Sequence, residues 1–141
     1  MKPKAIIVSG YFNPLHKGHI EYFKEARKYA DKLFIIVNND YQRELKGSKK
    51  FMDESERVLI ISELKICDNV VLSIDKDSSV INTLQKINSE FSSKFSLYFG
   101  NGGDQNNEII PERDICDKLS IKLIDNLGEK IQSSSWILNN K

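Results

Sequence analysis

Short apolar runs alternate along this chain with longer stretches in which apolar residues recur every three or four positions. The short runs are bounded by polar residues or glycine, as the buried strands of a parallel sheet usually are. The pattern therefore predicts five strands: Ala5–Ser9, Lys32–Val37, Asn69–Ser73, Phe95–Phe99 and Ile121–Asp125.

The stretches between these strands predict helices. Gly18–Ala30 places its apolar side chains on one face, and Glu54–Ile66 follows Asp53, which has capping-box spacing with Glu56. Three further helices are expected: Ser79–Phe91 with Ser78 or Ser79 as N-cap, a helix from Pro111 to about Leu119, and a short last helix after Ser133–Ser135.

Strands that alternate with helices indicate right-handed crossovers and a parallel sheet. The predicted fold is a doubly wound α/β domain of Rossmann-like type, with a five-stranded parallel sheet and helices on both faces. We expect a single domain over residues 1–141, because this length supports one core but not a separate substrate domain.

In such a fold, ligands bind beyond the carboxyl ends of the strands. The segments expected at that edge are Gly10–Lys17, Asn38–Met52, Ser73–Asp77, Gly100–Asn107 and Asn126–Ser133. The longest of them, Asn38–Met52, is predicted to be irregular, and irregular segments of that length in a compact domain usually serve a function.

Composition narrows the classes of protein. The formal net charge is +1, which gives no electrostatic argument for a nucleic-acid or membrane partner. No apolar run approaches the roughly 18 residues that a membrane-spanning helix needs, and the first run is too short for a signal peptide. Cys67 and Cys116 stand alone, so we expect reduced thiols in a cytoplasmic protein and neither a disulfide nor a cysteine metal site.

The chain's two histidines, His16 and His19, fall where the first strand gives way to the first helix. At this spacing they share one face of the first helical turn. Imidazole N–H groups at a helix N-terminus are suited to holding a polyphosphate and to stabilising charge at an attacked phosphorus. Gly18 leaves room for a nucleotide beside the backbone. Ordinary helix histidines and a two-histidine metal site are the alternatives, although no Glu or Cys stands at matching spacing.

The residues around the histidines add a resemblance to a known family. Gly10–His19 reads GYFNPLHKGH and resembles the G-x-F-D-P-x-H-x-G-H signature of the cytidylyltransferase-like nucleotidyltransferases. Three later segments are also similar to motifs of this family: Phe51–Arg57 (FMDESER), Cys67–Val71 (CDNVV) and Gln132–Ser135 (QSSS). Its small single-domain members include the glycerol-3-phosphate cytidylyltransferases.

The resemblance implies transfer of CMP from CTP to a small phosphorylated alcohol or sugar, with ATP and a sugar phosphate or cofactor precursor as the alternative. A phosphate oxygen of the acceptor would attack the α-phosphorus in line, and pyrophosphate would leave. A phosphate monoester has a second pKa of about 6, so it is largely ionised near neutrality and needs no general base. The resemblance also implies Mg²⁺, held mainly by the triphosphate, and a homodimer.

Matching positions in the family motifs imply roles for individual residues. His16, His19 and Lys46 would be catalytic, and no residue is expected to bind a metal directly. The acceptor would be bound by Asp40, Lys49 and Arg57. The nucleotide would be bound by Gly10, Tyr11, Phe12, Asn13, Gly18, Gly100, Asn101, Gly103, Asp104, Gln132, Ser133, Ser134 and Ser135.

Simpler interpretations stay open for several of these residues. Arg43–Lys50 is also typical of a solvated basic loop, Gly100–Asp104 of a plain turn, and Ser133–Ser135 of helix N-caps. Arg57 also fits a surface ion pair with Asp53 or Glu54, worth about 0–1 kcal/mol.

Two other classes of function are compatible with parts of the sequence. A nucleotide-binding module without turnover is favoured by Asn13, which replaces the family's usual Asp, and by the lack of the Arg that relatives carry shortly before Gln132–Ser135. Lys130 can substitute for that Arg as a point charge but not as a bidentate donor. A fragment of an aminoacyl-tRNA synthetase would share the H-x-G-H element. Its lysine-rich loop would then come unusually early, at Lys46–Lys50, and 141 residues leave no room for an anticodon-binding domain.

Overall fold

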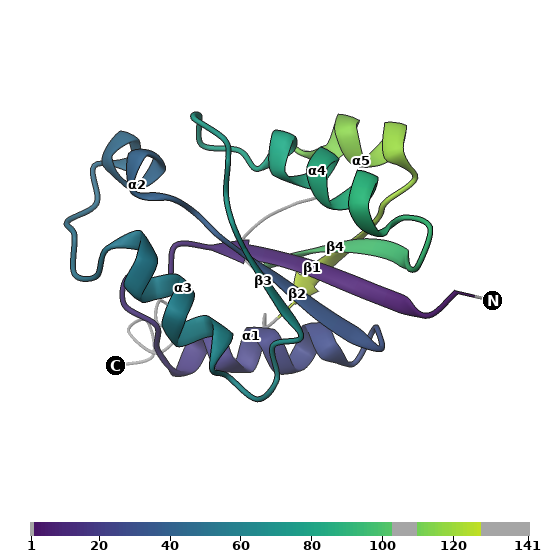
Figure 1. Cartoon of the computed structure of the whole chain (residues 1–141), viewed down its shortest axis with the longest axis horizontal. Coiled ribbons are helices and arrows are strands. Elements are labelled where there is room, and N and C mark those ends of the chain that lie inside the picture. The colour runs from purple at the N-terminus through teal and green to yellow at the C-terminus, as the bar shows by residue number, and fades with distance from the viewer. Residues whose placement is uncertain (1, 103–109, 128–141) are drawn as a thin grey trace.

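A computed structural model describes residues 2–102 and 110–127 of the chain. The described part builds one parallel sheet between two layers of helices (Figure 1). In chain order its elements are β1 (Lys4–Gly10), α1 (Lys17–Arg27), β2 (Lys32–Val37), α2 (Asp40–Lys46), α3 (Glu54–Ser62), β3 (Asn69–Leu72), α4 (Ile81–Phe91), β4 (Ser96–Gly102), α5 (Arg113–Leu119) and β5 (Lys122–Leu127).

The sheet has the strand order β3-β2-β1-β4-β5, and all neighbouring strands are parallel. The chain builds outward from β1 to β3, then returns to the other side of β1 for β4 and β5. The order reverses between β1 and β4, which is the point where doubly wound sheets open a crevice for ligands. The predicted fold class and all five predicted strands are confirmed, with strand ends shifted by at most three residues.

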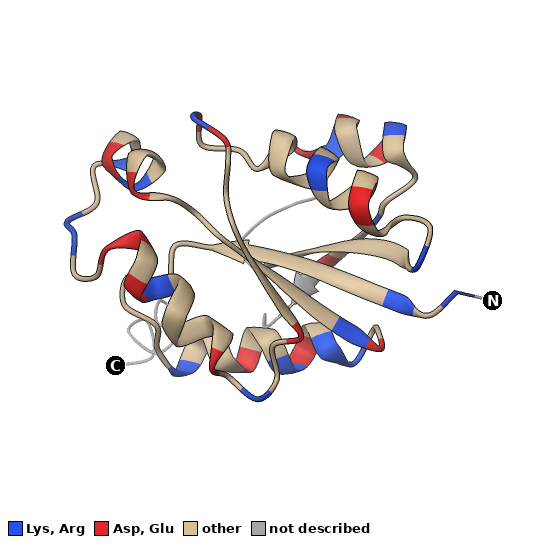
Figure 2. Cartoon of the chain, viewed as in Figure 1, with Lys and Arg blue, Asp and Glu red and all other residues tan. Residues whose placement is uncertain are grey.

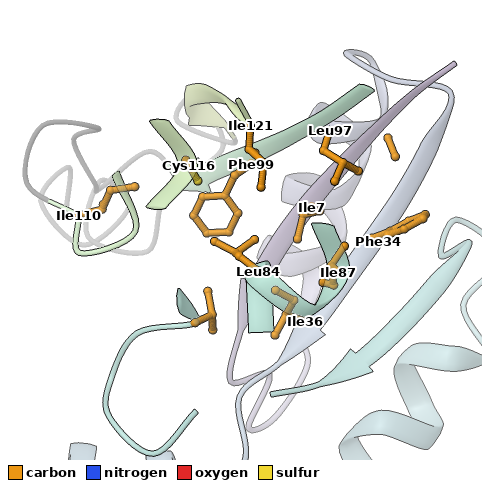
Figure 3. Close-up of a cluster of buried hydrophobic side chains, with 12 residues drawn as sticks. Ile7, Phe34, Ile36, Leu84, Ile87, Leu97, Phe99, Ile110, Cys116 and Ile121 are labelled. Atoms are coloured by element: carbon orange, nitrogen blue, oxygen red, sulfur yellow. The ribbon is translucent and has the colours of Figure 1, made fainter. Parts of the chain in front are cut away.

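Alternation along β1 and β2 divides the core between the two faces of the sheet. Ile6, Val8, Leu33 and Ile35 pack in the same cluster as Phe23 of α1, and Ile61 of α3 joins them. The opposite face of the sheet carries α4 and α5. There the core consists of Ala5, Ile7, Phe34, Ile36, Val80, Leu84, Ile87, Leu97, Phe99, Ile110, Cys116 and Ile121 (Figure 3).

The prediction that Asn38–Met52 is irregular is wrong, because this stretch contains helix α2. The Asn39 side chain accepts a hydrogen bond from the Gln42 amide at 2.8 Å, and the Gln42 side chain accepts one from the Asn39 amide at 3.0 Å. Gly47 then ends the helix in the left-handed conformation, at φ +78°. An Asn and a Gln three positions apart make this capping box with amides in place of the usual hydroxyl and carboxyl groups.

Other helix ends also differ from the prediction. Helices α1 and α3 end at Arg27 and Ser62, earlier than the apolar pattern indicates. Helix α4 is not capped by Ser78 or Ser79 in the way predicted, because its N-cap is Val80. Instead the buried carboxylate of Asp75 accepts hydrogen bonds from the backbone amides of Asn82 and Thr83, at 2.8 and 2.9 Å. The predicted cap of α3 is confirmed: the Asp53 side chain accepts from the Glu56 amide at 2.8 Å.

Gln42 fixes α2 to the connection between β3 and α4. Its side chain is fully buried, and its Nε2 donates to the carbonyl oxygens of Asp77 and Ser79 at 2.7 and 2.8 Å. Its Oε1 also accepts from the Asn38 side chain at 3.1 Å. Helix α2 carries Lys46 at its end, so this network positions a predicted site residue.

Charged residues of both signs are distributed over both helical layers (Figure 2). The connection between α2 and α3 carries basic residues, Lys49 and Lys50, and both are exposed. Within the described ranges, no helix is long and apolar enough to cross a membrane.

We predict that Gln42→Leu lowers the free energy of unfolding by about 1–3 kcal/mol. Leu cannot form hydrogen bonds, so the buried groups that bond to the Gln42 side chain are left without a partner. Urea denaturation of the variant and the wild type measures the difference. Gln85→Leu, at an exposed position of α4, is the control and should change stability by less than about 0.5 kcal/mol. Equal losses in the two variants would contradict this role of Gln42.

Candidate active site

The histidine turn, residues 11–16, leaves the carboxyl end of β1 at the point where the strand order reverses. Helix α1 begins directly after it, at Lys17, so its N-terminus faces the same edge of the sheet. The end of β4 lies next to β1 in the sheet. The histidine turn, which was predicted to bind phosphate, therefore lies where this fold presents backbone N–H groups to ligands.

Phe12 anchors the turn in the core. Its side chain is buried although its backbone is left-handed, at φ +52°. Its ring makes edge-on contacts with Phe23 and with His19, at centroid distances of 5.4 and 5.0 Å. A Cβ at Gly10 would lie 2.8 Å from this ring, so glycine is required there. Gly10 and Phe12 thus shape the turn and hold the His19 ring in place.

The backbone determines which nitrogen of each histidine carries the proton. The Nδ1 of His16 accepts a hydrogen bond from the Gly18 amide at 3.1 Å, and the Nδ1 of His19 accepts one from the His16 amide at 3.1 Å. A nitrogen that accepts carries no proton, so in this geometry each ring is protonated at Nε2. The turn therefore supplies two Nε2–H donors.

The two imidazoles are stacked, with centroids 3.9 Å apart and planes inclined by 29°. Burial and, to a smaller extent, the neighbouring His16 together lower the pKa of His19 to about 4. His19 is therefore uncharged near neutrality and acts as a hydrogen-bond donor and not as a cation. Nothing in this arrangement requires a metal to hold the pair together.

Packing against the His16 ring explains why position 18 is a glycine, and the sequence does not reveal this contact. A Cβ at this position would lie 2.9 Å from Cε1 of His16 and 3.2 Å from its Nδ1. The missing side chain thus lets the His16 ring lie over the first turn of α1. That Gly18 also leaves room for a nucleotide beside the backbone stays a prediction.

Arg57 connects the loops around the turn. Its guanidinium group is fully buried and donates to the carbonyl oxygens of Tyr11, Asn38 and Met52, at 2.9, 2.6 and 3.2 Å. Its NH2 group also pairs with the Asp40 carboxylate at 2.7 Å. The interpretation of Arg57 as a surface ion pair with Asp53 or Glu54 is therefore wrong. These bonds attach Arg57 to the loops around the turn, and its predicted contact with the acceptor stays a prediction.

Asp40 takes part in the same structural network. Its carboxylate accepts from Arg57 and from the Glu54 amide, the latter at 3.1 Å, while its own amide donates to the Glu54 carboxylate at 2.9 Å. Burial opposes ionisation of Asp40, but these bonds and the two nearby arginines outweigh it and hold the pKa of the carboxyl below its usual value. The predicted contact of Asp40 with the acceptor remains untested.

The lysine segment, residues 46–50, lies beside the histidine turn. The Nζ of Lys46 lies 4.4 Å from the centre of the Tyr11 ring, within the range of a cation–π contact. Lys49 is connected to the turn through its backbone: its carbonyl oxygen accepts from Nδ2 of Asn13 at 2.7 Å. The structure thus places Lys46 and Lys49 beside the turn that ends at His16, one helical turn before His19 of α1.

Gly100 and Asn101 belong to β4, which extends to Gly102, so the prediction that they follow the strand as a loop is wrong. Both are buried, and the Gly100 carbonyl accepts from the Tyr22 hydroxyl of α1 at 2.9 Å. The other predicted nucleotide-binding residues lie outside the described residues: Gly103, Asp104, Gln132, Ser133, Ser134 and Ser135.

Two features of the site were not predicted from the sequence. The burial of Arg57 depends on carbonyl groups from three distant segments, and no local pattern indicates such an arrangement. The contact of Asn13 with the lysine segment likewise joins residues 36 positions apart. In residues 2–102 and 110–127, no three His, Cys, Asp or Glu side chains are grouped so that they could hold a metal ion.

We predict that folding stability depends on the titration of His19. Its pKa is lower in the folded chain (about 4) than in the unfolded one (about 6.5), so protons bind the unfolded state first. The contribution is fully present above pH 6.5 and is lost as the pH falls towards 4. Urea midpoints measured from pH 4 to 7.5 should fall less steeply for His19→Asn, which keeps a hydrogen-bond acceptor but does not titrate. Parallel profiles for the variant and the wild type would contradict the buried, neutral His19.

Comparison with known proteins shows which family this chain is similar to. FAD synthase of Thermoplasma volcanium is 38% identical over 72 residues, which are 51% of this chain and 51% of that protein. Bifunctional protein HldE of Blochmanniella floridana is 32% identical over 137 residues, 95% of this chain and 27% of that protein. The chain thus matches about half of the length of the first relative and about a quarter of the second.

A crystal structure of a lipopolysaccharide core biosynthesis protein from Thermoplasma volcanium has the same fold. It superposes with a TM-score of 0.70 at 26% sequence identity, covering 88% of this chain and 96% of that chain. A family model described as cytidylyltransferase-like matches residues 7–126, which include the end of β1, the histidine turn and the Arg57 network. The chain belongs to the cytidylyltransferase-like family of nucleotidyltransferases.

Proposed function

We propose that this chain transfers a nucleotidyl group from a nucleoside triphosphate to a small phosphorylated acceptor and releases pyrophosphate. Membership of the family supports the reaction type. The observation that carries the proposal is the pair of stacked imidazoles at the helix N-terminus. The backbone holds both Nδ1 atoms, so both rings offer an Nε2–H donor at the edge of the sheet where ligands bind.

The reaction needs the groups that this site supplies. A phosphate oxygen of the acceptor forms a bond to the α-phosphorus, the bond from that phosphorus to the bridging oxygen breaks, and its electrons leave with pyrophosphate. Negative charge on the α-phosphate oxygens is stabilised by the Nε2–H groups of His16 and His19 and by the N-terminus of α1. Lys46 adds a positive charge next to them.

The same geometry indicates that the histidines act as donors and not as general bases. In each ring Nδ1 already accepts a backbone N–H and Nε2 already carries a proton, so no free lone pair remains to remove a proton. A phosphorylated acceptor suits such a site, because its phosphate is largely ionised before it binds. An unphosphorylated alcohol would need a base that this pair does not provide.

We propose ATP as the nucleotide, with CTP as the second candidate. FAD consists of an adenylyl group joined to flavin mononucleotide, so the relative named FAD synthase supports adenylyl transfer to a phosphorylated cofactor precursor. The resemblance of the histidine motif to the cytidylyltransferases favours CTP and glycerol 3-phosphate. Assays with each nucleotide and each acceptor decide between them.

Mg²⁺ and a homodimer are further parts of the proposal. The described residues provide no ready-made group of metal ligands, so Mg²⁺ would enter with the triphosphate, and we assign it no step. The homodimer remains a prediction from family resemblance. Sedimentation at several protein concentrations tests it.

We predict that the wild type releases pyrophosphate from ATP, or from CTP, only when a phosphorylated acceptor is present. Flavin mononucleotide, glycerol 3-phosphate and a sugar 1-phosphate form the first panel of acceptors. His16→Ala and His19→Ala should each lower turnover about 10²–10³-fold, the usual cost of losing one preorganised donor to the transition state.

Lys24→Ala is the control, because Lys24 is an exposed residue of the same helix and lies beyond the first turn. Urea denaturation checks that the histidine variants remain folded. Near-normal turnover in both histidine variants would defeat the proposed mechanism. Nucleotide binding without pyrophosphate release, for every acceptor tried, would instead indicate a binding module without catalysis.

A further inference from the structure

The Asn13 side chain is directed to the lysine segment. Its Nδ2 donates to the Lys49 carbonyl at 2.7 Å, and its Oδ1 accepts from the amides of Phe51 and Met52, both at 3.0 Å. Both lone pairs of Oδ1 and one of the two N–H groups are therefore used within the protein. Little hydrogen-bonding capacity is left for a nucleotide or a metal ion.

The segment from Gly47 to Met52 has few other attachments in the structure. The Phe51 side chain is 66% exposed, and the side chains of Lys49 and Lys50 are also exposed, so burial of apolar surface does not hold this segment. Arg43 holds its beginning, because an NH1 group donates to the Ser48 carbonyl at 2.6 Å.

The far end of the segment is held at Met52. Its carbonyl oxygen accepts from Nε of Arg57, while its amide donates to Asn13. Between Ser48 and Met52, the hydrogen bonds that fix the backbone go to Asn13. Between the two ends held by Arg43 and Arg57, Asn13 therefore fixes the backbone that carries Lys49 and Lys50.

We propose that Asn13 is a positioning residue that holds the lysine segment against the histidine turn, so that lysines and imidazoles contact the same triphosphate. This inference rests on the proposed function. Asn13 stands three residues before His16 in the same turn. Movement of this segment away from Asn13 would thus separate Lys49 and Lys50 from the imidazole donors.

The chemistry of the contact explains why an amide occupies this position. One terminal atom of this side chain must donate to the Lys49 carbonyl oxygen while the other accepts from two backbone amides. An Asn side chain does both. An ionised Asp, which the family motif has here, can accept the same two bonds but would place a negative oxygen against the Lys49 carbonyl. The departure from the family motif is therefore matched to this loop, and it does not imply loss of activity.

Limited trypsin digestion without nucleotide tests the contact directly, since trypsin cleaves after Lys49 and Lys50. Cleavage there should be about tenfold faster in Asn13→Ala, because this variant loses the three bonds that close the segment. Asn13→Asp keeps the two accepted bonds and should be intermediate. Asn88→Asp, the same change on α4 on the opposite face of the sheet, is the control and should be cleaved like the wild type. Unchanged cleavage in Asn13→Ala would overturn the proposal.

Kinetics test whether Asn13 acts through the lysines. Asn13→Ala should raise KM for the triphosphate about tenfold and change kcat less. In a background of Lys49→Ala and Lys50→Ala, the further effect of Asn13→Ala should shrink below about twofold, because the residues act as one unit. Fully additive effects would overturn the positioning role. So would an Asn13→Asp variant more active than the wild type, since that result would place the residue on the nucleotide or its metal.

The two assays separate this inference from the proposed function. Trypsin cleavage requires no catalysis, so faster cleavage of Asn13→Ala in a protein without transferase activity would reject the function and support the contact. Normal transferase activity with unchanged cleavage and unchanged KM in Asn13→Ala would reject the inference alone.

Discussion

The site depends on one buried charge. The guanidinium group of Arg57 has no exposed surface, so its N–H groups need acceptors within the protein. It finds them in the loop after β1, at the end of β2 and in the connection before α3, with Asp40 as the counter-charge. A buried charge that loses its hydrogen-bond acceptors destabilises the fold strongly, because it cannot be solvated. This requirement keeps three loops together at the edge of the sheet that carries the histidine turn.

Around the histidines, backbone hydrogen bonds determine which ring nitrogen carries the proton. Phe12 buries one side of the turn, Gly18 makes room for the His16 ring, and two amides occupy the Nδ1 atoms. The result is a pair of Nε2–H donors beside a helix N-terminus, with lysines from another segment nearby. Such donors suit the proposed nucleotidyl transfer, in which charge on a phosphate needs stabilising and the acceptor is already ionised.

The sequence predicted the parts of the fold that local patterns specify. Five apolar runs with polar boundaries located the strands, and the histidine motif located the site. Helix α2 was missed although Asn39, Gln42 and Gly47 carried usable signals, because a long polar stretch was interpreted as a loop. The internal contacts of Arg57 and Asn13 could not be predicted from the sequence for a different reason. Both side chains bond to carbonyl and amide groups that only the tertiary fold brings within hydrogen-bonding distance, so no local pattern indicates these internal contacts.

The most direct test of the account is the protonation state of the two imidazoles with and without nucleotide. A long-range ¹H–¹⁵N correlation spectrum of the histidine side chains at pH 7 reports it, with a nonhydrolysable triphosphate added stepwise. The account predicts a bare Nδ1 and a protonated Nε2 in both rings, and shifts of both Nε2 signals as the triphosphate binds. A proton on Nδ1 of either ring, or a spectrum that does not change at saturating triphosphate, would contradict it.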